Sequence, residues 1–359
     1  MTRIPAPDLD ADPFEERTRR RTRGPLDLLG GRFMFESNSA RLLELVDEAY
    51  ADLPPQRLPG PVPKYRVRLL ALGAPAVGSA RRNAAPRRSG RLDPPAKSAR
   101  GEPAPLVMLS GPSSLGGASA ASDAVLVSPG ERSGLVLVSP STLRSPYHAR
   151  YELIEFAVFT LASRCRGLVS LHAACVGRAG RGVLLMGSSG AGKSTVTLTA
   201  LGRGFELLSE DSVFATPGTL LATGVPSFLH VRADSLRWLG SRREMTAIRA
   251  SPVIRRRSGV RKYELDLRCS GYCIARAPLE IAAVVFLSAG GGDAAPRMRR
   301  VAGRELAHRL RAAQAYAAGQ AGWPTFAKSV ARVGAYEIGR GRHPLETVEL
   351  LERLLERPR

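Results

Sequence analysis

A glycine-rich segment between an apolar run and a helical pattern constrains the fold of this 359-residue chain more than any other feature. The run Val183 to Met186 leads into Gly-Ser-Ser-Gly-Ala-Gly-Lys-Ser, residues 187–194, which fits the pattern G-x-x-x-x-G-K-[ST]. A helical pattern follows and ends near Gly202 and Gly204. A strand, a loop and a helix in this order predict an α/β fold in which loop amides wrap phosphate oxygens.

The residue types in this loop suit nucleotide binding. Glycines let the backbone approach a ligand or adopt a positive φ. We expect Lys193 to reach the β- and γ-phosphates and the Ser194 hydroxyl to help hold Mg²⁺. The predicted ATP-binding residues are Gly187, Ser188, Ser189, Gly190, Ala191, Gly192, Lys193, Ser194 and Thr195.

Two adjacent carboxylates, Glu210 and Asp211, end the short apolar run FELLSED, 17 and 18 residues after Lys193. One carboxylate can bind Mg²⁺, directly or through water, and the other can accept a proton from an incoming hydroxyl. An exposed acidic turn is the alternative for such a pair. The apolar run Leu279 to Ala289 has no acid at its tip, which argues against a metal-organising carboxylate there.

The charge of the chain favours no particular partner. The formal net charge is +21, and the 53 basic residues include only five lysines. Basic residues cluster in 18–23 and 81–100, and we interpret these segments as a solvated tail and linker. Nucleic-acid binding is disfavoured because no recognition-helix, zinc-finger or aromatic stacking pattern accompanies the charge.

Cysteine content and hydropathy predict a cytoplasmic protein. The four cysteines suggest no disulfide framework and complete no zinc site, so we expect reduced thiols. The N-terminus lacks the apolar core of a signal peptide. No window contains eighteen uninterrupted apolar residues, and we therefore expect no membrane partner.

The patterns divide the chain into three parts. Residues 1–30 are rich in proline and charge and are expected to form a disordered tail. Residues 31–150 predict a small α/β region with a disordered basic loop at about 73–105. This region offers no chemistry of its own and is expected to pack on the rest or hold a partner. Residues 151–359 predict the ATP-binding catalytic domain.

The segment Gly167 to Val231 resembles a known family. It contains Leu171-His172 fifteen residues before the loop, then the loop, then R-G-x-x-L-x-x-x-D ending at Asp211. This combination resembles the catalytic domain of HPr kinase/phosphorylase, and more closely the shorter HPr-kinase-related serine kinases. The resemblance implies a mixed β-sheet flanked by helices, related to ATP-dependent phosphoenolpyruvate carboxykinase, with ATP and Mg²⁺ as cofactors.

The resemblance also implies roles for individual residues. Lys193 and Ser194 match nucleotide and metal positions, with Asp211 as the second metal residue, and His172 matches a histidine near the transferring phosphate. The family has Asp-Asp at the paired acids, and the first acid is its catalytic base, so Glu210 is expected in that role. The segment Leu220 to Leu236 lacks the E-x-R-G-x-G motif of the bifunctional enzymes, so phosphorylase activity is not expected.

The sequence leaves several functions open. Lys262 follows a basic run and is expected either to add a second cation over the triphosphate or to lie in a solvated hairpin. A kinase that phosphorylates a serine of a protein or peptide is the first hypothesis. A P-loop ATPase or regulatory nucleotide-binding module is the second, and a basic scaffold or nucleic-acid-binding protein is the third. The kinase hypothesis is compatible with a homo-oligomer.

Overall fold

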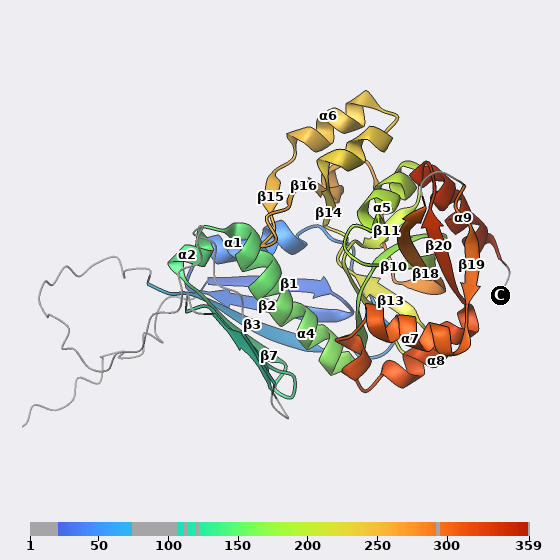
Figure 1. Ribbon diagram of the computed structural model, residues 1–359. Helices are drawn as coiled ribbons and strands as arrows, with labels where there is room; N and C mark the ends of the chain where they lie inside the picture. Colours follow the sequence, from blue (N-terminus) through green and yellow to red (C-terminus); the bar gives the residue numbers. More distant parts are fainter. Residues whose placement is uncertain (1–20, 74–106, 111–113, 120–121, 292–294, 358–359) are drawn as a thin grey trace, which may run out of the picture.

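Two large β-sheets and their helices build this protein. The computed structural model describes residues 21–73, 107–110, 114–119, 122–291 and 295–357. In Figure 1 the N-terminal sheet, blue to teal, lies beside the C-terminal sheet, whose strands run from green to red. Both sheets mix parallel and antiparallel pairs, which confirms the mixed α/β class.

The N-terminal sheet has seven strands in the order β1-β2-β3-β7-β6-β5-β4. Exposed and buried residues alternate along β3, as expected for a sheet with one covered face. Helices α1 (Ala40–Tyr50) and α4 (Glu155–Arg166) cover that face and share a core with it. The strands are β1 (Arg21–Leu28), β2 (Gly31–Ser37), β3 (Lys64–Ala71), β4 (Val107–Ser110), β5 (Leu115–Ala118), β6 (Ala124–Ser128) and β7 (Ser133–Val138).

The C-terminal sheet is built around β10 (Arg181–Met186), which leads into the glycine-rich loop. β10 is parallel to β18 (Leu279–Gly291) and antiparallel to β9 (Ala174–Arg178). The main path runs β17-β11-β9-β10-β18-β13-β12-β8, and β20 pairs with both β18 and β19. The other strands are β8 (Val169–His172), β11 (Glu206–Ser209), β12 (Ser212–Ala215), β13 (Leu221–Gly224), β17 (Cys273–Ile274), β19 (Met298–Val301) and β20 (Ala335–Arg340).

Helices bury both faces of β10. Val183 and Leu185 lie in a core with helices α5 and α9, while Leu184 and Met186 lie in a core with α7 and α8. This double burial explains the continuous apolar run before the loop. The helices are α5 (Lys193–Gly202), α7 (Gly303–Ala313), α8 (Trp323–Val333) and α9 (Pro344–Glu356).

A small third sheet stands between the two large ones, next to α1 (Figure 1). It consists of β14 (Phe228–Val231), β16 (Arg261–Asp266) and β15 (Val253–Arg255), with helix α6 (Arg242–Ala250) above it. The short helices are α2 (Pro140–Leu143), α3 (Pro146–His148), η1 (Ala149–Ile154), η2 (Ala233–Trp238), η3 (Leu267–Cys269) and η4 (Ala317–Gly319).

The expected segmentation needs two corrections. The predicted tail 1–30 is wrong for its last part, because residues 21–28 pair with β2 as strand β1. Helix α4 packs in the N-terminal core, so the module changes at Gly167, where the helix ends, rather than at residue 150. Residues 1–20, and the predicted basic loop after Gly73, lie outside the described residues.

Two further observations concern the expected compartment. None of the helices formed by the described residues is long and apolar enough to cross a membrane. All four cysteines, Cys165, Cys175, Cys269 and Cys273, are free thiols.

Candidate functional site

The glycine-rich loop connects β10 to α5, as predicted. Gly190 and Gly192 have φ angles of +86° and +97°, a region that favours glycine. A Cβ atom on Gly187 would lie 2.7 Å from the carbonyl oxygen of Leu287, so a side chain there would collide with β18. The sequence pattern therefore found glycines that the backbone requires.

The loop presents hydrogen-bond donors. Within the described chain, the amide of Ala191 donates to the Ser188 carbonyl at 3.1 Å, whereas the amides of Gly192 and Lys193 donate to no backbone carbonyl. The Lys193 ammonium folds back and donates to the Gly187 carbonyl at 2.6 Å. Burial lowers the pKa of Lys193, although the nearby acids oppose this effect. Free amides and an ammonium at a helix N-terminus are suited to phosphate.

The two adjacent acids occupy different environments. Glu210 is buried, with 6% of its surface exposed, and its Oε1 accepts a hydrogen bond from the Ser194 hydroxyl at 2.7 Å. Its Oε2 lies 2.7 Å from Nδ1 of His230 and also accepts the His230 amide at 3.2 Å. Burial alone would raise the pKa of Glu210, but His230, Lys262 and Ser194 outweigh it and lower the pKa to about 2.

The Glu210 pair continues into a buried network that sequence patterns did not reveal. Nε2 of His230 lies 3.4 Å from Oε1 of Glu264. The same oxygen accepts a hydrogen bond from the Tyr151 hydroxyl at 3.0 Å and forms an ion pair with Arg150. Burial disfavours the charged imidazole, but Glu210 and Glu264 raise the pKa of His230 to about 9. His230 is therefore held as a cation.

Asp211, in contrast, is partly exposed and faces open space. Its Oδ1 lies 3.2 Å from Nδ1 of His172, and its Oδ2 lies 3.4 Å from the Arg256 guanidinium. The Gln314 side chain fixes the end of β8, because its amide bonds both the N–H and the carbonyl of His172 at 2.8 and 2.9 Å. The structure therefore brings together His172 and Asp211, two residues that the sequence predicted for the site.

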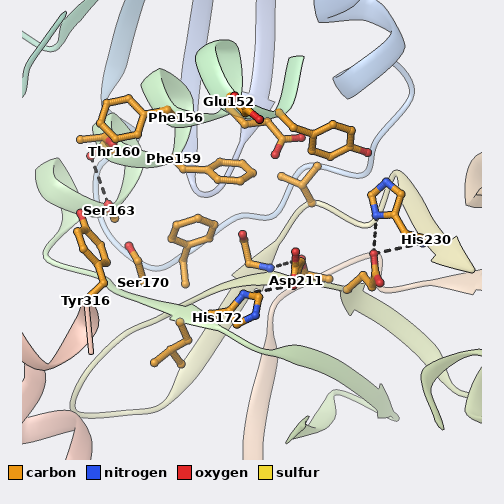
Figure 2. A pocket seen from close by; sticks show the side chains of 18 of the residues that line it. Glu152, Phe156, Phe159, Thr160, Ser163, Ser170, His172, Asp211, His230 and Tyr316 are labelled. Atoms are coloured by element: carbon orange, nitrogen blue, oxygen red, sulfur yellow. Dashed lines mark hydrogen bonds and ion pairs between the residues drawn. The ribbon is translucent and has the colours of Figure 1, made fainter. Parts of the chain in front are cut away.

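Two cavities meet at these acids. The first, of about 450 Å³, is lined by the glycine-rich loop, Lys262 and Arg340, and we call it the phosphate cavity. The second, of about 710 Å³, is lined by aromatic side chains of several elements, among them Phe156 and Phe159 of α4 and Phe214 of β12, and we call it the aromatic cavity. Both cavities share four residues: His172, Glu210, Asp211 and Arg256. Figure 2 shows His172 and Asp211 opposite Phe156 and Phe159 of α4.

Six lysine and arginine side chains are among the described residues that line the phosphate cavity, and three of them lie close to the two acids. Lys193 comes from the loop, and Arg256 and Lys262 come from the β15–β16 hairpin. Burial lowers the pKa of Lys262, against the attraction of Glu210, whose Oε1 lies 4.0 Å from its Nζ. The Nε atom of Arg256 is buried and has no hydrogen-bond partner among the described residues. Buried donors normally have a hydrogen-bond partner, so this free N–H is suited to donate to an anionic ligand in the cavity.

The predicted site residues largely converge. Of the predicted nucleotide-binding residues 187–195, all but Gly187 line the phosphate cavity. Thr195 also bonds Ser235, with 2.8 Å between the hydroxyl oxygens. His230, Glu264 and Arg256 were missed, because their partners lie far away in sequence. The only available signal was the apolar-flanked His230 in the strand pattern of 228–231.

The residues present fit a Mg²⁺–nucleotide in part. Ser194 and Glu210 place a hydroxyl and a carboxylate together, and Asp211 lines the same cavity. No group of three or more His, Cys, Asp or Glu in the described residues could hold a metal ion by itself. Mg²⁺ commonly binds through one or two protein groups together with substrate phosphates.

Comparison with known proteins gives a distant result. No protein-family model matches the chain, and no curated protein matches it. Among solved structures, the HPr(Ser) kinase/phosphatase from Coxiella burnetii is similar over 52% of this chain and 90% of its own chain. The identity is 15% and the TM-score is 0.26.

Proposed function

We propose that this protein is an ATP-dependent phosphotransferase that moves the γ-phosphate to the serine hydroxyl of a protein or peptide. The observation that carries the proposal is the junction of the two cavities at His172, Asp211 and Arg256. A nucleotide-binding module or simple ATPase requires only the phosphate cavity. The adjoining aromatic cavity provides room for an acceptor, which favours transfer over hydrolysis.

The phosphate cavity would bind and neutralise the triphosphate. The loop amides and Lys193 would hold the β- and γ-phosphates, and Arg256 and Lys262 would balance charge that develops during transfer. Mg²⁺, when bound with the nucleotide, would neutralise part of the phosphate charge. Ser194 and Glu210 are the residues suited to orient it, since a hydroxyl and an ionised carboxylate already lie 2.7 Å apart.

The acceptor proton is better assigned to Asp211 than to Glu210. Glu210 is buried, is engaged by Ser194 and His230, and has a pKa of about 2, which makes it a weak base. Asp211 is partly exposed and lines both cavities. We therefore propose Asp211 as the general base and Glu210 as the metal-organising acid, the reverse of the roles expected from the family resemblance.

The proposed reaction is an in-line displacement. The acceptor oxygen attacks the γ-phosphorus, the bond between that phosphorus and the bridging oxygen breaks, and ADP leaves. The acceptor proton passes to Asp211, which His172 and Arg256 orient from either side. The chain contributes mostly positioning and charge stabilisation, as is usual for phosphoryl transfer.

Intact-mass measurement tests the proposal. Purified protein would be incubated with ATP, Mg²⁺ and serine-containing peptides, and each peptide would be weighed for the gain of one phosphate. We expect phosphorylation by the wild-type protein, and a loss of about 10² to 10⁴ in rate for Asp211→Asn, with ATP affinity retained. ATP consumption that never depends on an acceptor, or full activity of Asp211→Asn, would contradict the proposal.

A further inference from the structure

The aromatic cavity lies where the two modules meet. One wall is α4 of the N-terminal module, which directs Phe156, Phe159 and Ser163 toward the space (Figure 2). The opposite wall is formed by β8 and β12 of the C-terminal sheet and by Tyr316, which follows α7. The volume of about 710 Å³ is within the range of small-molecule binding sites and exceeds the needs of a single hydroxymethyl group.

Aromatic rings dominate the inner surface. Phe159 and Phe214 pack edge to face with centroids 5.0 Å apart, and Tyr147 and Tyr151 lie 4.7 Å apart. Tyr316 keeps 59% of its surface exposed at the rim. Where aromatic surface is not covered by other side chains, binding of an apolar group that covers it is favourable.

The charges around this cavity differ from those of the chain as a whole. Its lining includes four carboxylates, Glu152, Glu155, Glu210 and Asp211, against Arg256 as the sole lysine or arginine among the described lining residues. Since Glu155 keeps its proton near neutral pH and His230 is a cation, three ionised carboxylates face Arg256 and His230, and the lining carries a small negative balance in contrast to the net charge of +21 for the whole chain. An anionic acceptor would be repelled at this wall, whereas a neutral or cationic one would not.

Glu155 adds a polar contact within the apolar wall. Glu152 is paired with Arg257, and Glu210 with His230, but the Glu155 carboxyl makes no hydrogen bond or ion pair with other described residues. Burial raises the pKa of Glu155 to about 8, so near neutral pH this carboxyl retains its proton. A protonated carboxyl can donate a hydrogen bond to a carbonyl oxygen of a bound ligand.

We propose that the aromatic cavity selects the acceptor by taking an aromatic or branched aliphatic group carried next to the reacting hydroxyl, on a substrate that has no acidic group nearby. This inference rests on the proposed function, because it identifies the cavity as the acceptor subsite. The cavity shares His172 and Asp211 with the phosphate cavity and is also lined by Phe159, so a group bound against Phe159 would lie on the acceptor side of these two residues. A serine peptide with an apolar neighbour and a free aryl-alkyl alcohol share this chemistry.

Capped dipeptides test the selection. The probes are acetyl-Ser-Phe-amide, acetyl-Ser-Ala-amide and acetyl-Ser-Glu-amide, with 3-phenylpropan-1-ol as the free alcohol. We expect kcat/KM for the Phe peptide to exceed that for the Ala peptide by about tenfold or more, with the Glu peptide lowest. A higher kcat/KM for 3-phenylpropan-1-ol than for the Phe peptide would identify a free alcohol, rather than a peptide, as the class of acceptor.

Two variants link the preference to the cavity. Phe159→Trp fills the space, and Tyr316→Ala removes an exposed ring at the rim, so each should reduce the Phe-over-Ala ratio toward one. Val333→Ala, on α8 and outside both cavities, is the matched control and should keep the wild-type ratio. Equal kcat/KM for the Phe and Ala peptides in the wild-type protein, or an unchanged ratio in both cavity variants, would overturn the inference.

Calorimetry separates this inference from the proposed function. Binding of the three peptides to the wild-type protein with ADP and Mg²⁺ requires no transfer. If the Phe peptide binds more tightly than the other two but is not phosphorylated, the subsite proposal stands and the kinase proposal is refuted. If the peptides are phosphorylated without a preference for Phe, the kinase proposal stands and the subsite proposal is refuted. Failure of the Phe peptide to bind at millimolar concentration would also refute the subsite.

Discussion

At the scale of single residues, burial separates two neighbours that look equivalent in sequence. Glu210 and Asp211 are adjacent acids at the end of an apolar run, and the sequence predicted that both belong to the site. Their environments come from His230, Arg256 and Glu264, which lie in other strands and hairpins. No local pattern encodes those contacts, so the assignment of roles to the two acids could not be made from the sequence.

Removing the charge of Glu210 should destabilise the fold. Glu210→Gln or His230→Gln breaks the buried ion pair by removing one of its charges, so the free energy of unfolding should fall by about 3–5 kcal/mol. Asp211→Asn, at the partly exposed neighbour, is the matched control and should change it by less than about 1 kcal/mol. Urea denaturation followed by circular dichroism measures all three. Equal effects at the two positions would refute the buried role given to Glu210.

At the scale of elements, the strand, loop and helix around residues 183–202 followed the sequence closely. A loop with this glycine spacing has few ways to fold. The preceding strand β10 is buried on both faces, and a strand buried in this way has a continuous apolar run in its sequence. The β15–β16 hairpin was less predictable. Its basic residues could equally have been solvated, and only tertiary packing turns Arg256 and Lys262 toward the loop.

The hairpin should contribute to nucleotide binding. Lys262→Met removes a cation that lines the phosphate cavity, so the KM for ATP should rise by about tenfold, with a smaller change in Tm. Lys328→Met, on the exposed side of α8, is the control for loss of a lysine. Steady-state ATP kinetics measure both. Unchanged KM in Lys262→Met would assign the hairpin to structure alone.

At the scale of the whole molecule, the N-terminal module forms part of the site. Its sequence showed no chemistry, and its α/β class was all that periodicity could predict. In the structure, α4 supplies one wall of the aromatic cavity, and Arg150 joins the network that ends at Glu210. Sites assembled between modules are invisible to local patterns, because their residues share no spacing.

The buried network and Glu155 should give stability a pH dependence. The pKa of His230 rises from 6.5 to about 9 on folding, so its contribution is complete below pH 6.5 and is lost as pH rises through 9. Glu155, raised from 4.5 to about 8, acts in the same direction. Thermal unfolding between pH 6 and 9.5 should therefore show a falling Tm. Glu155→Gln should flatten this fall, and a Tm that rises over the range would contradict the assignment.

A crystal structure with the β,γ-imido analogue of ATP and Mg²⁺ tests the central claim most directly. The account predicts a terminal phosphate in the phosphate cavity, within hydrogen-bond distance of Lys193 and the loop amides, with its outer face turned toward Asp211 and the aromatic cavity. A terminal phosphate that points away from Asp211, or an analogue bound outside the loop, would contradict it.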